Sequence, residues 1–158
     1  METATVTPAQ TTAAEQFVAF FEELWAVGSS DPERFFAMLA ERTAPDALMS
    51  QPLAPPARGP AGQRQVFGPL FEAIPDLGVD VIRWGATPDG ALLEIRLHGT
   101  LGGRPVSWEA VDRFVLRDGH IVARHSYFDP LPLVRAMALA PRASAKLLPS
   151  LVKGRRGR

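Results

Sequence analysis

Several features that would assign this chain to a common protein class are missing, and each absence excludes a class. Cysteine is absent, which excludes disulfides, thiolate metal sites and a cysteine nucleophile, and suits a reducing cytosol. No uninterrupted apolar run approaches the roughly 20 residues that span a bilayer. The polar, small N-terminal residues include no basic stretch followed by an apolar one, so we predict no signal peptide. We expect a soluble, cytoplasmic protein.

Signatures of cofactor binding are missing as well. Only three histidines occur, and no close pair among them has the spacing of metal ligands. No glycine-rich phosphate-binding motif is present, which argues against a nucleotide cofactor. We therefore predict a protein that works without a metal or any other cofactor.

The charge balance gives no sign of a polyanionic partner. Lys+Arg and Asp+Glu both total 17, so no overall field favours nucleic acid or an anionic membrane. The segment 153–158 carries four positive charges, a pattern typical of a solvated tail. Ala, Pro and Arg are abundant and lysine occurs only twice, which is consistent with a GC-rich bacterial genome. We expect binding neither to nucleic acid nor to membranes.

The length and composition fit one globular domain. The chain has 158 residues, of which 46% are hydrophobic and 22% charged, enough to bury a core. We expect a flexible segment over residues 1–12, one domain over 13–135, and a helical extension with a basic tail over 136–158.

Helical signals dominate the first half of the chain. The sequence Thr12-Ala13-Ala14-Glu15 is typical of a capping box, and apolar residues then recur at helical spacing up to Gly28. The sequence Ser30-Asp31-Pro32-Glu33 predicts the start of a second, shorter helix. Helical spacing returns over residues 63–74, where Pro69 should kink or break the helix.

Strand signals follow the helices. A short apolar stretch, Ala47 to Gln51, predicts a first strand before the proline-rich loop 52–60. Further on, turn sequences separate four segments and predict an antiparallel meander over residues 79–86, 91–101, 105–117 and 120–128. Helices followed by a meander indicate an α+β fold, in which one sheet curls over the helices and encloses an interior. The tail beyond Asp129 predicts one or two more helices.

The most unusual residue is Asp112, the only charge on an apolar strand face. Alternation along the strand groups Val106, Trp108, Ala110, Asp112, Phe114 and Leu116 on that face. A carboxylate in such surroundings must be paired, hydrogen-bonded or neutral, because burying it unpaired is costly. In the preceding strand an apolar face containing Leu97 alternates with a polar one containing His98, which we expect outside, at a subunit contact.

The partner of Asp112 depends on the turn at Asp118-Gly119. A two-residue turn pairs Arg117 with His120 and places Asp112 opposite His125, whereas a three-residue loop places it opposite Arg124. Either register supplies a cation. Such a pair can be purely structural, or it can hold an acid, a base or a hydrogen-bonding group in a pocket.

These features resemble the nuclear transport factor 2-like superfamily, and within it the SnoaL-like polyketide cyclases, ketosteroid isomerases and limonene epoxide hydrolases. The likeness covers approximately residues 13–135. Besides the two opening helices, it is carried by Ala44-Pro45-Asp46-Ala47, Arg58-Gly59, Gly99-Thr100, Arg117-Asp118-Gly119-His120-Ile121 and Tyr127-Phe128-Asp129. It implies a cystatin-like cone, with N-terminal helices on a strongly curved antiparallel sheet that encloses a pocket for a small apolar molecule. It also implies a homodimer through the outer sheet face.

The resemblance implies a role for Asp112 and shows where this chain departs from its relatives. In ketosteroid isomerases the matching acid, kept neutral by an apolar site, helps to bind an oxyanion. The positions of their general base and oxyanion tyrosine hold Gln51 and Phe21. In limonene epoxide hydrolases Asp112 matches one aspartate of an Asp–Arg–Asp arrangement, whose arginine and second aspartate are replaced by Ala110 and Ser126.

Leu101 stands where SnoaL-like cyclases commonly have a histidine, so Asp112 is the shared polar position that remains. Two functions stay open. The first is a cyclase, isomerase or hydratase/hydrolase that acts on a polyketide- or terpenoid-like molecule by acid/base chemistry at Asp112, with Arg124, His125 and Ser126 as neighbours. The second is a non-catalytic ligand-binding or scaffold module. The predicted pocket consists of Phe21, Trp25, Gln51, Phe67, Phe71, Leu97, Trp108, Ala110, Phe114 and Phe128.

Overall fold

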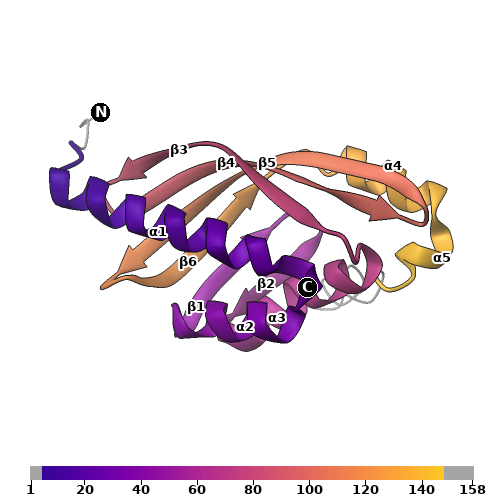
Figure 1. Cartoon of the computed structure of the whole chain (residues 1–158), viewed down its shortest axis with the longest axis horizontal. Coiled ribbons are helices and arrows are strands. Elements are labelled where there is room, and N and C mark those ends of the chain that lie inside the picture. The colour runs from indigo at the N-terminus through magenta and orange to yellow at the C-terminus, as the bar shows by residue number, and fades with distance from the viewer. Residues whose placement is uncertain (1–4, 148–158) are drawn as a thin grey trace.

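The structure is a computed structural model that describes residues 5–147. These residues form helices that pack on a six-stranded sheet (Figure 1). The helical elements are α1 (Pro8–Val27), the short 3-10 helix η1 (Gly28–Ser30), α2 (Pro32–Glu41), α3 (Gly59–Ala73), α4 (Leu131–Leu139) and α5 (Pro141–Ser144). The strands are β1 (Thr43–Gln51), β2 (Ala54–Arg58), β3 (Gly78–Thr87), β4 (Gly90–Leu101), β5 (Arg104–Arg117) and β6 (His120–Tyr127). Within the described residues, no helix has the length and apolar character needed to cross a membrane.

The first helix begins earlier than its sequence predicts. Thr7 is the N-cap, and its side chain forms a capping box with Gln10, which satisfies two amide groups at the helix start. The box predicted at Thr12 is wrong, because the Thr12 hydroxyl instead donates to the Pro8 carbonyl within the helix, 3.1 Å away. The cap predicted for the second helix is confirmed, since Asp31 accepts a hydrogen bond from the Arg34 amide.

Helix α3 begins at Gly59, four residues before the predicted start at residue 63, and continues through Pro69. Gly59 has a φ of +61°, and a Cβ there would lie 2.3 Å from the Pro45 carbonyl oxygen. Only glycine combines this backbone conformation with so close an approach. The Arg58-Gly59 sequence therefore marks the point where the chain turns from strand β2 into the helix.

Strand β2 lies inside the segment predicted to be a loop. It pairs antiparallel with β1, with Met49 opposite Ala57. The loop prediction over residues 52–60 is wrong at this point because β2 is the edge strand of the sheet, and an edge strand tolerates prolines that cannot donate to a ladder.

The meander predicted for the second half of the chain is confirmed. The strand order is β2-β1-β6-β5-β4-β3, and β3 to β6 pair antiparallel along their length. Strand β1, however, runs parallel to β6. The sheet is therefore mixed rather than wholly antiparallel. Strand β1, which follows the opening helices, lies next to the last strand of the meander and runs in the same direction.

A bulge in β6 changes the register on which the partner of Asp112 depends. Arg117 lies opposite His120 and Leu116 opposite Ile121, as a two-residue turn predicts. The next residue, Val115, lies opposite Ala123, so the register shifts between these pairs. One extra residue of β6 is accommodated there. Asp112 consequently lies opposite Ser126, so both predicted registers are wrong.

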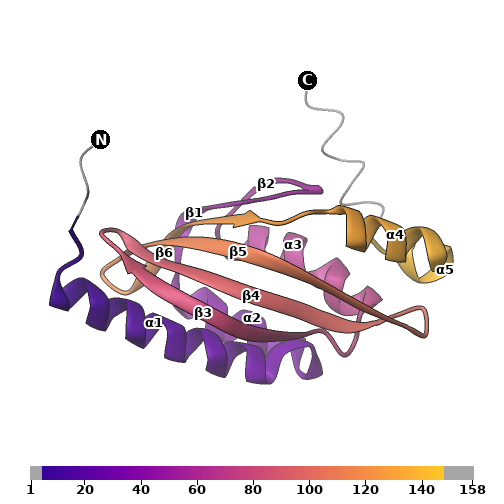
Figure 2. The same ribbon diagram turned by 90° about the horizontal axis from the view of Figure 1, so that it is seen from above.

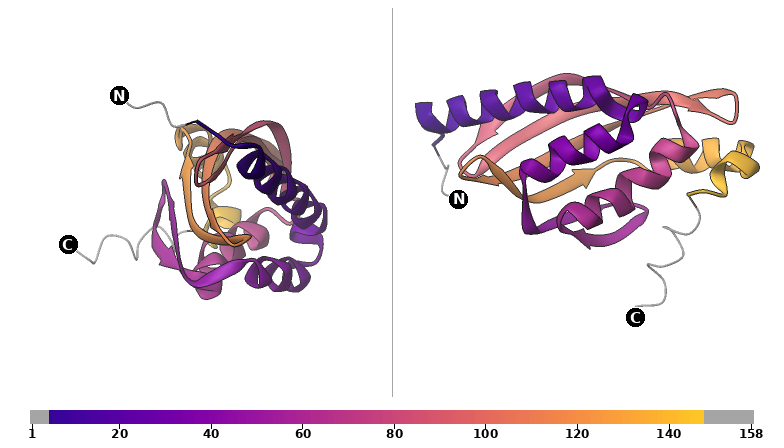
Figure 3. Two further views of the ribbon diagram at one scale, coloured as in Figure 1. Left: turned by 90° about the vertical axis from the view of Figure 1, so that its left-hand side faces the viewer. Right: turned by 60° about the horizontal axis from the view of Figure 1, so that its bottom comes forward.

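The core lies between the helices and one face of the sheet. Helix α1 packs on β3 and β4, and α3 packs on β1 and β2; Figure 2 shows the sheet in front of α2 and α3, and the end-on view in Figure 3 shows the strands curving around the helices. The alternation predicted for β4 and β5 is confirmed, since Leu93, Ile95, Trp108 and Phe114 are buried. Helices α4 and α5 lie at one end of the sheet (Figure 1).

Candidate functional site

Asp112 forms a buried ion pair with Arg124. Arg124 Nε donates to Asp112 Oδ2 over 2.7 Å, and the two side chains are 8% and 1% exposed for Arg124 and Asp112 respectively. The bulge in β6 explains this partner, because it places Ser126 opposite Asp112 and Arg124 two residues away on the same inner face. The pair is electrically neutral as a unit, which offsets part of the cost of removing both charges from water.

The second oxygen of Asp112 has no partner. Among the described residues, Oδ1 is the only fully buried side-chain nitrogen or oxygen without a hydrogen bond. Buried polar groups in folded proteins are almost always hydrogen-bonded, because an unsatisfied one costs about 1–3 kcal/mol. Asp112 Oδ1 is therefore free to accept a hydrogen bond from a molecule other than the protein.

Arg124 links the aspartate to two further side chains. Its Nη1 donates to Gln51 Oε1 over 3.0 Å, and its guanidinium carbon lies 5.2 Å from the centre of the Phe67 ring. The described residues give Nη2 no hydrogen-bond partner. One nitrogen of the guanidinium thus holds the aspartate, one holds Gln51, and one remains available as a donor.

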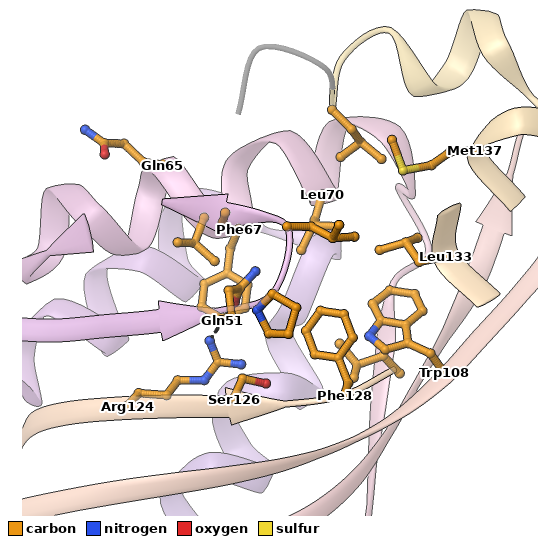
Figure 4. A pocket seen from close by; sticks show the side chains of 16 residues that line it. Gln51, Gln65, Phe67, Leu70, Trp108, Arg124, Ser126, Phe128, Leu133 and Met137 are labelled. Atoms are coloured by element: carbon orange, nitrogen blue, oxygen red, sulfur yellow. Dashed lines mark hydrogen bonds between the residues drawn. The ribbon is translucent and has the colours of Figure 1, made fainter. Parts of the chain in front are cut away.

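An open pocket, here called the outer cavity, lies beside this arginine and measures about 60 Å³. In Figure 4, Gln51, Arg124, Ser126 and Phe128 converge on it, and the dashed line marks the bond from Arg124 to Gln51. Its walls are Gln51, Pro52, Leu53, Ala54, Gln65, Val66, Phe67, Leu70, Leu97, Trp108, Arg124, Ser126, Phe128, Leu133, Met137 and Leu147.

A second pocket, here called the inner cavity, lies under the first two helices and measures about 20 Å³. Its walls are Phe17, Phe20, Phe21, Leu24, Trp25, Phe35, Leu39, Met49, Gln63, Phe67, Ile95, Leu97, Asp112, Phe114, Ile121 and Arg124. Phe67, Leu97 and Arg124 line both cavities. The ion pair therefore stands at the boundary, with Asp112 on the inner side and Arg124 facing both.

The C-terminal helices complete the outer cavity. Leu133 and Met137 of α4 line it, and α4 packs on β5. A Cβ on Gly102, in the turn between β4 and β5, would lie 2.6 Å from the Ala140 Cβ. Glycine at residue 102 therefore allows the junction of α4 and α5 to lie close to this turn. The one or two helices predicted for the tail are confirmed up to residue 147, whereas the basic segment 153–158 lies outside the described residues.

The structure brings most of the predicted site residues together, with three exceptions. His125, predicted beside Asp112, lies on the opposite face of β6, across from Arg113, and lines neither cavity. Phe71 and Ala110 are buried but also line neither. Phe71 instead packs edge-on against Phe35, with ring centroids 5.0 Å apart. The bulge in β6 accounts for the position of His125, and aromatic packing between helices accounts for that of Phe71.

One buried polar residue that lines a cavity escaped the sequence analysis. Gln63 of α3 is 1% exposed and lines the inner cavity. Its position was readable, because residues 63, 66, 67, 70 and 71 follow helical spacing and form the apolar stripe of that helix. A glutamine within such a stripe is buried and must find hydrogen-bond partners.

Metal ligation has no counterpart in the described part of the chain. No group of three or more His, Cys, Asp or Glu side chains there is arranged to hold a metal ion. Asp112 and Arg124 are the only ionisable side chains among the described residues that line the two cavities. Any proton transfer by the protein in these cavities therefore has Asp112 as its one carboxyl group.

The comparison with protein families gives one match. The profile of the SnoaL-like domain matches residues 17–124, which include all strands except the end of β6, most of the first three α-helices and the Asp112–Arg124 pair. Among curated proteins, none matches the chain significantly.

Three solved structures have the same fold, and this chain covers almost the whole length of each. A protein from Jannaschia sp. CCS1, named as a SnoaL-like polyketide cyclase, is 22% identical, with a TM-score of 0.71 over 86% of this chain and 98% of its own. An LEH-like epoxide hydrolase from M. tuberculosis is 20% identical, with a TM-score of 0.63 over 89% and 99%. AclR from Streptomyces galilaeus, named as a hydroxylase, is 21% identical, with a TM-score of 0.65 over 79% and 98%. At these identities the likeness shows the fold.

Proposed function

This chain belongs to the SnoaL-like family, and from that premise we propose that it is a cofactor-independent enzyme of the cyclase, isomerase or hydratase/hydrolase type. It acts on a small apolar molecule of polyketide- or terpenoid-like character, by acid/base chemistry at Asp112. The observation that carries the proposal is the unpartnered Oδ1 of Asp112, buried at the wall of an apolar cavity.

A purely structural ion pair explains this oxygen poorly. Arg124 holds only Oδ2 of the carboxylate and directs its other bond to Gln51. A stabilising role would favour a geometry in which both oxygens are satisfied, because the unpaired one lowers stability. A ligand that donates to Oδ1, or gives it a proton, accounts for the free lone pairs.

The outer cavity supplies the complementary hydrogen-bond donors. Arg124 Nη2 is unpartnered, and Ser126 lines the cavity without a side-chain hydrogen bond among residues 5–147. Such donors stabilise negative charge on a carbonyl oxygen, more effectively in a cavity with little water than in bulk solvent. They support binding of a ketone or ester group beside the ion pair.

Together these groups suit proton abstraction next to a carbonyl. Asp112 Oδ1 takes a proton from the carbon, the C–H bond breaks, and its electron pair moves onto the carbonyl oxygen to give an enolate. The donors of Arg124 and Ser126 stabilise that oxygen. Asp112 then returns the proton to another atom of the molecule, or the enolate carbon forms a new C–C bond to a second carbonyl, whose oxygen receives the proton. These outcomes are isomerisation and cyclisation.

The charge of the site favours a neutral ligand. The positive charge of Arg124 is compensated by Asp112, and none of the other described residues that line the cavities is ionisable. An anionic ligand would enter this apolar space without an uncompensated cation to pair with, which is costly. We therefore propose neutral carbonyl compounds rather than carboxylates as ligands.

The test is a screen of the purified protein by thermal shift and native mass spectrometry against neutral polyketide, terpenoid and steroid compounds, including whatever copurifies. We expect at least one compound to stabilise the protein and to be converted into a product of altered structure. A compound that is bound but never altered would contradict an enzyme.

That second outcome corresponds to the alternative, a non-catalytic ligand-binding protein of the same fold. The observation that favours it is that Asp112 is the one carboxyl group among the described residues that line the cavities, while Gln51 stands where the resemblance to ketosteroid isomerases places the general base. A protein that only binds would lose little affinity for a hydrocarbon-like ligand on Asp112→Asn.

We also propose that the protein is a cytoplasmic homodimer that associates through the outer sheet face. Leu92, Val111 and Tyr127 are 39%, 39% and 60% exposed there. Charges of both signs lie beside them, including the Arg96–Glu109 pair, so the face can complement a second copy around a two-fold axis. A monomeric mass at micromolar concentration would contradict this.

A further inference from the structure

The inner cavity contains two polar atoms that protein groups leave unpartnered, and both are hydrogen-bond acceptors. The first is Oδ1 of Asp112. The second is Oε1 of Gln63, for which the described residues provide no donor and which, unlike Asp112 Oδ1, keeps some accessible surface. Both side chains are 1% exposed and line the same cavity.

The orientation of the Gln63 amide is fixed by a chain of hydrogen bonds. The Thr43 hydroxyl donates to the Leu39 carbonyl over 2.7 Å. A hydroxyl has a single hydrogen, so toward Gln63 the Thr43 oxygen can act only as an acceptor. The atom that faces it, 2.6 Å away, must therefore be the amide nitrogen Nε2. Oε1 occupies the other arm of the amide.

A cavity with these walls distinguishes hydrogen-bond donors from acceptors. The remaining lining is apolar except for Arg124, whose Nε and Nη1 are already engaged and whose free Nη2 lies on the side of Ser126 and Phe128, which line the outer cavity (Figure 4). A carbonyl group would face two oxygens and gain nothing, whereas an O–H group can satisfy either acceptor. A volume of about 20 Å³ is enough for one water molecule, which needs roughly 10–15 Å³ on this measure.

We propose that the inner cavity is a donor subsite, in which Asp112 Oδ1 and Gln63 Oε1 accept hydrogen bonds from O–H groups. Water supplies these groups in the resting protein, and a hydroxyl of the ligand supplies one when the apolar walls move aside. Where the ligand is concerned, this inference rests on the proposed function. It narrows the ligand to a neutral molecule with a hydroxyl at its inner end.

The outer cavity has the opposite polarity. Its free groups near the ion pair are the donors of Arg124 and Ser126, so a carbonyl is favoured there. A molecule that spans both cavities past Phe67 and Leu97 would place its carbonyl outside and its hydroxyl inside. Hydroxyketones and hydroxylated aromatic ketones have this arrangement.

The test is crystallography of the wild type and two matched variants. Gln63→Met removes the proposed acceptor with little change of volume. Gln16→Met makes the same substitution at an exposed residue of α1 that lines neither cavity. Each protein is crystallised alone and after soaking with phenol, a small neutral hydroxyl compound.

We expect an oxygen atom within about 3.2 Å of Gln63 Oε1 in the wild type and in Gln16→Met, and its loss in Gln63→Met. A phenol oxygen at the acceptors after soaking would assign the donor to the ligand. A retained water, with phenol absent from the inner cavity, would assign it to solvent.

The proposal is overturned if the wild type shows no oxygen at either acceptor with or without phenol, or if Gln63→Met keeps the oxygen in place. The wild-type crystals decide the matter even where a variant does not fold. The readout needs no turnover, so failure of the proposed enzyme function, seen as turnover that survives Asp112→Asn, is recognised separately.

Discussion

The two faces of β5 each carry an ion pair, and the pairs differ in almost every respect except their distance. On the outer face Arg96 and Glu109 lie 2.8 Å apart with side chains 50% and 58% exposed. On the inner face Arg124 and Asp112 lie 2.7 Å apart, at 8% and 1% exposure. The outer charges remain hydrated, and such pairs contribute about 0–1 kcal/mol.

The inner pair is buried, and the described protein groups give Asp112 Oδ1 no hydrogen bond. Replacing a buried pair by apolar residues of the same volume is often neutral or stabilising. A buried pair is therefore weak evidence for stability, and we propose that the cavities on either side of this pair explain its presence. The contrast teaches that contact distance alone does not separate a structural ion pair from a functional one.

The largest expected effect on stability comes from leaving Asp112 without its cation. Arg124→Met should lower the free energy of unfolding by about 3–5 kcal/mol, because an uncompensated charge remains buried. Arg96→Met on the outer face should leave it nearly unchanged, because solvent screens an exposed pair. Urea unfolding of both variants measures the difference. Equal losses would mean that the inner pair is as solvated as the outer one.

A second prediction compares two glycines on opposite faces of the sheet. A Cβ on Gly99 would lie 2.4 Å from Ile74 Cγ2, whereas one on Gly85 would meet nothing within 4 Å. Gly99→Ala should therefore cost about 1–3 kcal/mol through overpacking, and Gly85→Ala less than about 0.5 kcal/mol. Thermal unfolding checks both. A tolerated Gly99→Ala would show that the inner face is loosely packed at this point.

The smallest effect concerns Asp76, an exposed aspartate with both oxygens satisfied. Hydrogen bonds from the Thr100 side chain, and then from its backbone amide, hold the pKa of Asp76 below its usual value. Because the folded pKa is lowered, the stabilisation is complete above about pH 4 and is lost as the pH falls through the folded value.

Asp76→Asn should therefore cost less than about 1 kcal/mol at neutral pH, given its exposure, and the gap to the wild type should close in acid. Urea unfolding at a series of pH values measures that gap. A gap that stays constant down to the lowest pH would show that the carboxylate charge contributes nothing.

Much of the fold could be predicted from the sequence because local signals and tertiary structure agree. The turns at Gly102-Gly103 and Asp118-Gly119 delimit the meander, and alternation places Asp112 on the inner face. Strand β2 was missed because an edge position, which sequence alone does not reveal, is what permits its prolines.

The site was predicted in part for a similar reason. Arg124 was one of two candidate partners, and the choice rested on a bulge in β6 that no turn sequence announces. That bulge also moved His125 to the outer face. The apolar lining followed from periodicity, whereas the division into two cavities depends on how Phe67 and Arg124 pack across helices and strands.

The most direct test of the central claim is the rate of product formation from a compound found in the screen, measured for the wild type, Asp112→Asn and Glu109→Gln. The asparagine side chain would keep an acceptor for Arg124 but leave its charge uncompensated, so we expect the Asp112→Asn variant to remain folded in circular dichroism, at a cost of up to about 3–5 kcal/mol. We predict a loss of rate of roughly 10²–10⁴-fold for Asp112→Asn and no loss for Glu109→Gln on the outer face. Undiminished turnover by folded Asp112→Asn would contradict the account.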